Sequence, residues 1–176
     1  MNYEEEIGRL LIKNKLTIST TESCTGGLLS SKLTDVSGSS AYITLNLTTY
    51  SNEAKNKLLG VSWDTLNTKG AVSEECSIEM AKGLYKLTNS DICVSTTGIA
   101  GPTGGSKEKP VGLMYSTICT MSRLKTYQIR LDSSIPRIEM KEKFVQEILK
   151  NIYDFINEQK KNGVAVIFVG EDLDVL

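Results

Sequence analysis

Three residues that could activate one another occur between positions 38 and 55. The stretch GSSAYITLNLTTYSNEAK contains Ser40, Tyr50 and Lys55, and the whole chain contains no histidine. A serine nucleophile without histidine needs another general base, and a lysine can serve when burial lowers its pKa and keeps the amine neutral. A tyrosine hydroxyl could orient or relay the proton. These residue types therefore predict a hydroxyl nucleophile activated by an amine.

The spacing favours Tyr50 and Lys55 as neighbours. If a strand ends near Tyr50 and a helix starts near Ser51, both side chains can face one pocket at the junction. Ser40 lies at the other end of that strand, so it reaches them only if the strand bends or the pocket follows one face. The alternative is a turn serine, a core tyrosine and a solvated helix lysine.

The glycine-rich turn TTESCTGG (20–27) follows an expected strand and precedes an expected helix. A helix N-terminus exposes unpaired amides and a positive dipole end, which favour a phosphate or a developing oxyanion. Ligands also bind at the carboxyl ends of strands in open α/β sheets. Glu22 and Ser23 should lie at this end of the strand, and Ser23, Thr25 and Gly26 are candidate substrate-binding residues. A simple tight turn is the alternative.

A second glycine-rich turn, TTGIAGPTGG (96–105), also follows an expected strand. Thr96 and Thr97 supply hydroxyls, and glycines such as Gly98 let the backbone approach a ligand. The turn lacks the lysine of an ATP-binding P-loop, which excludes that motif. Arg137, at the start of the last helix, could bind a phosphate bidentately. A flexible connection and a solvated arginine are the alternatives.

The elements that must position these residues alternate between helix and strand patterns. Strand patterns occur at 16–21, 41–50, 92–98, 113–120 and 125–131, the last two as an antiparallel hairpin. Helix patterns occur at 4–15, 26–36, 51–60, 73–87 and 137–160, the last with apolar residues every three or four positions. A further apolar run, 164–170, suits an edge strand or a tail. The mixture predicts an α/β layered fold with a mixed sheet.

Composition limits the classes of function. A length of 176 residues suits one domain, and a net charge of −1 does not favour nucleic-acid or anionic-membrane binding. No apolar run approaches the roughly 20 residues that span a bilayer. The four cysteines form no CxxC pair, which excludes zinc spacing. With an acidic N-terminus, these features predict a cytoplasmic protein with free thiols.

Four stretches, taken together, resemble the C-terminal domain of the competence/damage-inducible protein CinA, which also occurs alone as a nicotinamide mononucleotide deamidase. They are TTESCTGGLLSSKLTDVSGSSAY, TTYSNEAKNKLLGV, KGAVSEECSIEMAKG and TTGIAGPTGGSKEKPVG, in the family's order. The resemblance covers roughly residues 5–158. We expect a family domain over 1–162 and a tail of unassigned role over 163–176.

The resemblance implies a three-layer α/β/α sandwich and hydrolysis of nicotinamide mononucleotide to nicotinate mononucleotide and ammonia. It implies no cofactor and no metal. It places the catalytic serine at Ser40, with Lys55 and Tyr50, and the substrate-binding positions at Ser23, Thr25, Gly26, Thr97, Gly98 and Arg137. The expected partner is a small-molecule nucleotide, and a homodimer is plausible. The alternative is a non-catalytic nucleotide-binding module linked to competence or the DNA-damage response.

Overall fold

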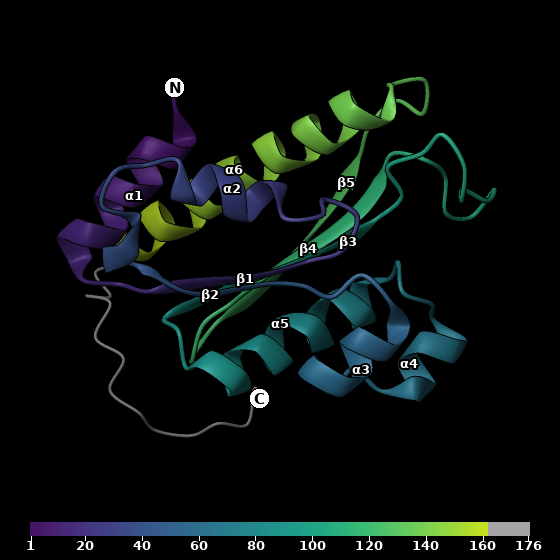
Figure 1. Ribbon diagram of the computed structural model, residues 1–176, viewed down its shortest axis with the longest axis horizontal. Coiled ribbons are helices and arrows are strands. Elements are labelled where there is room, and N and C mark those ends of the chain that lie inside the picture. Colours follow the sequence, from purple (N-terminus) through teal and green to yellow (C-terminus); the bar gives the residue numbers. More distant parts are fainter. Residues whose placement is uncertain (162–176) are drawn as a thin grey trace.

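The computed structural model describes residues 1–161 as one five-stranded sheet between two layers of helices (Figure 1). The strands are β1 (Ile18–Glu22), β2 (Ile43–Thr48), β3 (Ile92–Gly98), β4 (Leu113–Cys119) and β5 (Leu124–Arg130). The helices are α1 (Tyr3–Asn14), α2 (Leu28–Thr34), α3 (Asn52–Leu59), α4 (Trp63–Thr68), α5 (Glu74–Thr88) and α6 (Arg137–Lys161), with a 3₁₀ turn η1 (Ser39–Ala41). The predicted three-layer α/β/α sandwich with a mixed sheet is confirmed.

The strand order β2-β1-β3-β4-β5 combines a parallel half with an antiparallel half. β1 pairs in parallel with both β2 and β3, whereas β4 and β5 form the predicted antiparallel hairpin in unbroken register. Because β1, β2 and β3 run in the same direction, their carboxyl ends meet at one edge of the sheet. Open α/β sheets bind ligands at this edge.

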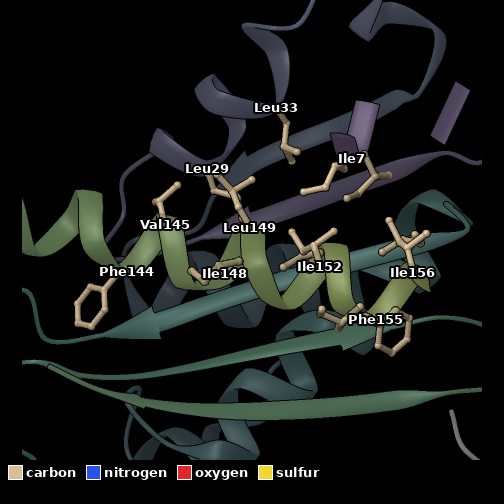
Figure 2. Close-up of a cluster of buried hydrophobic side chains, with 14 of the residues drawn as sticks. Ile7, Leu29, Leu33, Phe144, Val145, Ile148, Leu149, Ile152, Phe155 and Ile156 are labelled. Carbon is tan, nitrogen blue, oxygen red and sulfur yellow. The ribbon is translucent and has the colours of Figure 1, made fainter. Parts of the chain in front are cut away.

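Helices α1, α2 and α6 pack together over one face of the sheet and bury the larger apolar core (Figure 2). The apolar period predicted for the last helix is confirmed, since its repeating positions are all at most 1% exposed: Met140, Phe144, Ile148, Ile152 and Phe155. Burial of a large apolar side chain contributes roughly 1.5–3 kcal/mol. This stripe therefore fixes α6, whose first turn carries Arg137, against the sheet.

Helices α3, α4 and α5 cover the other face around a smaller core. The sequence did not predict α4, because six residues are too few to display a helical period. Ser62 caps this helix by accepting a hydrogen bond from the amide of Thr65. The carboxylate of Glu79 on α5 accepts from the Ser62 amide and the Thr65 hydroxyl, so α5 holds α4 in place.

Strand β2 is shorter than the predicted strand 41–50 and contains a bulge. The register with β1 shifts between Ile18 and Thr20, where β2 carries one extra residue. The side-chain oxygen of Asn46 accepts from both the amide and the hydroxyl of Thr20, so a side chain replaces part of the ladder. The predicted tail 163–176, with its strand candidate 164–170, lies outside the described residues. No helix in the described part of the chain is long and apolar enough to cross a bilayer.

Candidate active site

Lys55 is a buried amine at the carboxyl end of the parallel strands. Ser51 caps α3 by accepting from the Ala54 amide, which starts the helix immediately after β2. Helical side chains tilt toward the N-terminus, and that tilt directs the Lys55 amine back to the end of the strand. Its Nζ donates to the carbonyl oxygens of Thr49 (2.8 Å) and Tyr50 (3.0 Å) and lies 3.1 Å from the Ser23 hydroxyl oxygen. The residue is only 1% exposed.

The surroundings of Lys55 make its charged form less favourable than in a solvated lysine. Burial lowers the pKa of the amine, because the charged form loses its hydration. None of the described carboxylates lies within ion-pair distance of its Nζ. The nearby thiols of Cys76 and Cys24 act in the opposite direction, but burial raises their own pKa values to about 11 and about 12. At neutral pH these thiols carry no charge, so they supply no counter-ion for an ammonium group.

Two carbonyl oxygens and one hydroxyl oxygen surround the Lys55 Nζ, and as an ammonium group it would donate to all three. The same three contacts also suit a neutral amine. Such an amine has two N–H groups and one lone pair. The N–H groups can be directed to Thr49 and Tyr50, which leaves the lone pair free to accept the Ser23 proton. This arrangement is that of a general base bonded to its nucleophile.

Ser23 is the hydroxyl that the structure places beside Lys55. It directly follows β1 and is 9% exposed, so its side chain lies at the boundary between the interior and solvent. The Ser23 amide lies 3.4 Å from the hydroxyl of Thr96 on β3, and the Thr96 hydroxyl also bonds to that of Thr25. The hydroxyls of Thr96 and Thr25 therefore help to fix the conformation of the turn that carries Ser23. The sequence identified both Thr25 and the Thr96 hydroxyl as candidates, and the structure joins the two by a hydrogen bond.

Glu22 fixes the other side of this turn. Its buried carboxylate accepts the amides of Leu29 (2.9 Å) and Ser30 (2.9 Å) in the first turn of α2. The sequence predicted these unpaired helix amides as a site for phosphate or an oxyanion. That prediction is wrong for the amides that Glu22 occupies, because a protein carboxylate already satisfies them.

Ser40 is not beside Lys55, which corrects the predicted pairing. Ser40 is an exposed residue of η1, before β2, whereas Lys55 follows β2. The six residues of β2 span about 20 Å at roughly 3.3 Å per residue. The strand would have to fold back on itself to join the two groups, and its register with β1 shows a single bulge and no reversal.

Tyr50 and Arg137 meet at the mouth of the site. Tyr50 is 58% exposed, and its hydroxyl accepts from Arg137 Nη2 at 3.2 Å. The Nη1 of Arg137 donates to the carbonyl oxygen of Gly101 at 2.7 Å. One guanidinium thus joins the loop after β2, the loop after β3 and the start of α6. The backbone carbonyl of Tyr50, not its hydroxyl, contacts the lysine.

Thr97 and Gly98 have structural partners of their own. The Thr97 hydroxyl donates to the carbonyl oxygen of Ala71 at 2.6 Å, on the side of the sheet opposite to Thr96. A Cβ on Gly98 would lie 2.8 Å from the carbonyl oxygen of Leu113, so the glycine admits the backbone of β4. Close pairing of β3 with β4 explains the glycine at position 98, and the bond to Ala71 satisfies the Thr97 hydroxyl. Neither residue requires a ligand to explain its presence.

Gly26 is exposed and adopts a positive φ of 63°. A Cβ built on it would lie 3.4 Å from the Nζ of Lys141, one helical turn beyond Arg137 on α6. In the family resemblance Lys141 stands where a second arginine is usual, and that resemblance assigns it no separate role. Residues 1–161 contain no group of three or more His, Cys, Asp or Glu side chains arranged to hold a metal ion.

Comparisons with known proteins identify the family of the chain. A family model described as "CinA C-terminal domain" matches residues 1–156. A protein of Clostridium novyi (strain NT), described by its name as competence-damage inducible, is 51% identical over 138 residues, which are 78% of this chain and 33% of that protein. A "CinA-like protein" of Chloroherpeton thalassium is 46% identical over 159 residues, 89% of this chain and 38% of that protein. The chain thus spans about a third of the length of the curated relatives it matches.

Solved structures give the same result for the fold. The competence/damage inducible protein CihA from Agrobacterium tumefaciens superimposes with a TM-score of 0.81 at 38% identity, covering 88% of this chain and 96% of that one. A CinA superfamily protein from Klebsiella pneumoniae 700603 gives a TM-score of 0.84 at 28% identity, covering 89% and 96%. The similarity extends over almost the whole of both solved chains.

Proposed function

Since the chain belongs to the CinA C-terminal domain family, we propose that it is an amidohydrolase that converts nicotinamide mononucleotide to nicotinate mononucleotide and ammonia. The observation that carries this proposal is the environment of Lys55. It is a buried amine with no carboxylate of the described residues in ion-pair distance, and its Nζ lies 3.1 Å from the Ser23 hydroxyl oxygen. A serine–lysine pair of this kind performs acyl transfer without histidine or metal.

In the first half of the reaction, neutral Lys55 takes the Ser23 proton as the Ser23 oxygen bonds to the carboxamide carbon. The carbonyl electron pair moves to oxygen, giving a tetrahedral oxyanion. Backbone amides of the turn 23–27 are the proposed donors to that oxygen, and such donors typically contribute about 10²–10³ in rate. The protonated Lys55 then gives its proton to the amide nitrogen, the C–N bond breaks, and ammonia leaves.

In the second half, water attacks the acyl-enzyme and Lys55 accepts its proton. The C–O bond to Ser23 breaks, the serine oxygen regains a proton, and nicotinate mononucleotide is released. The carbonyls of Thr49 and Tyr50 hold the amine in place throughout. Tyr50 and Arg137 form the outer wall of the site through their hydrogen bond.

The test is turnover of nicotinamide mononucleotide by the purified chain. We expect ammonia and nicotinate mononucleotide in equal amounts, and rapid acid quenching should trap an acyl group on the peptide that contains Ser23. The alternative is a non-catalytic nucleotide-binding module, and the names of the relatives bear only on its link to competence or the damage response. Binding of the nucleotide without release of ammonia would support that module and refute the amidase.

A further inference from the structure

Two cations of α6 lie at the mouth of the site, and their bonding differs. Nη1 and Nη2 of Arg137 each donate one hydrogen bond to a protein acceptor, the Gly101 carbonyl and the Tyr50 hydroxyl, which fixes the position of the guanidinium. Lys141, four residues later, has its Nζ beside Gly26. Among the described residues Lys141 forms no ion pair. Two other lysines of the same helix do: Lys143 pairs with Glu139 and Lys150 pairs with Asp154, each four positions away.

The turn below Lys141 offers no charge to neutralise it. The acidic residue of that turn is Glu22, and its carboxylate is buried on the amides of α2. The Cys24 thiol is kept neutral by burial, although the positive charges of Arg137 and Lys141 both act on it. An ammonium group therefore lies within reach of the turn that carries Ser23, with its charge unmatched.

The surface between Lys141 and the turn suits an anionic group. Gly26 presents bare backbone, because it has no side chain and its φ is positive. A compact group with several acceptor oxygens can contact backbone there while it bonds to the ammonium. Lysine binds phosphate as a point charge, and such charge-assisted bonds are shorter and stronger than neutral ones.

We propose that Lys141 recognises the phosphate of the substrate and that Arg137 is a positioning residue that joins Tyr50 to the Gly101 loop. This inference rests on the proposed function and refines it, because the sequence alone favoured Arg137 as the phosphate ligand. Lys141 is then the residue that distinguishes a nucleotide from the corresponding nucleoside.

The experiment compares two amide substrates that differ only in the phosphate: nicotinamide mononucleotide and nicotinamide riboside. In Lys141→Met, we expect the ratio of kcat/KM between nucleotide and riboside to fall about 10- to 100-fold, mainly through KM for the nucleotide. Lys141→Arg should restore most of that ratio, because the charge is retained. Lys143→Met is the matched control, since it removes an exposed lysine of the same helix that pairs with Glu139, and the ratio should stay unchanged.

Arg137→Met tests the division of roles. A positioning residue should lower kcat for both substrates by a similar factor and leave the ratio between them intact. The inference is overturned if Lys141→Met leaves the ratio unchanged, or if Arg137→Met produces the selective loss on the nucleotide.

A binding measurement separates this inference from the amidase proposal. Calorimetry with nicotinate mononucleotide and nicotinate riboside requires no turnover. Tighter binding of the phosphorylated compound to the wild type, lost in Lys141→Met, supports the role of Lys141 even if neither amide is hydrolysed. Equal binding of the two compounds by the wild type refutes it even if the amide is hydrolysed.

Discussion

Two turns that both contain glycine and serine differ in the burial of their serine side chains and in the groups beside them. The turn ESCTGG at the carboxyl end of β1 holds Ser23 beside a buried amine, whereas GSSAY at the amino end of β2 holds Ser40 in solvent. Both turns combine glycine with small hydroxyl residues. The difference lies in their place in the sheet, because only the carboxyl ends of β1, β2 and β3 are close to the start of α3 and its Lys55.

The comparison shows that a serine acquires its chemistry from its neighbours. A free serine hydroxyl is a weak nucleophile at neutral pH, and a base must remove its proton during attack. Lys55 can do so because burial disfavours its ammonium form. Ser40 has no described base within hydrogen-bonding distance, and its side chain is exposed.

The largest effect should follow removal of the Ser23 hydroxyl. Ser23→Ala is expected to lower kcat for nicotinamide mononucleotide by about 10³-fold or more, since no oxygen remains to form the acyl-enzyme. Ammonia release under saturating substrate measures it. Full activity in Ser23→Ala would place the nucleophile elsewhere and remove the basis of the comparison.

Loss of the base should have a nearly equal effect. Lys55→Met keeps the length of the side chain and removes the amine, so kcat should fall by about 10²–10⁴-fold, the usual contribution of a general base. Circular dichroism and a thermal melt check that the variant folds. A folded Lys55→Met enzyme that retains its acyl-enzyme burst would contradict the assigned role.

The pH dependence of stability isolates the charge on Lys55. Its folded pKa lies below the ordinary 10.5 of the unfolded chain. Between these two values the unfolded state binds more protons, so stability rises with pH, by up to about 1.4 kcal/mol for each unit that separates the pKa values. Urea unfolding from pH 7 to 10.5 should therefore show a steeper rise for the wild type than for Lys55→Met. Parallel curves would mean that Lys55 titrates as an ordinary solvated lysine.

The smallest effect should come from Ser40. Ser40→Ala changes an exposed side chain of η1, so we expect kcat and KM within about twofold of the wild type and a change in unfolding free energy within about 0.5 kcal/mol. Steady-state turnover and urea unfolding measure these values. A large loss of activity in Ser40→Ala alone would reverse the comparison between the two turns.

Periodicity predicted the parts of the fold that depend on local pattern. The apolar stripe of α6 and the hairpin of β4 and β5 were predicted close to their observed bounds, because burial repeats regularly along each element. The bulge in β2 was not, since it depends on the side chain of Asn46 bonding to Thr20 on the neighbouring strand. A contact between strands leaves no local repeat.

The site was only partly predictable for the same reason. Lys55 could be selected from its distance to Tyr50 along the chain, because a strand–helix junction places both near one edge. Its hydroxyl partner depends on which strand lies next to β2, and that strand is β1. Proximity in the sequence favoured Ser40 as the partner. The order of the strands instead places the Ser23 hydroxyl oxygen 3.1 Å from the Lys55 Nζ, although the two residues are 32 positions apart in the chain.

The buried carboxylate of Glu22 has a consequence for how the protein would bind the proposed substrate. It ties the last residue of β1 to the first turn of α2, so the short segment between them is anchored at both ends before any ligand arrives. A segment held in this way loses little conformational freedom when the substrate binds. In the proposed reaction, the Ser23 oxygen is then aligned before the substrate binds, and binding energy is available to orient the amide instead of ordering the protein.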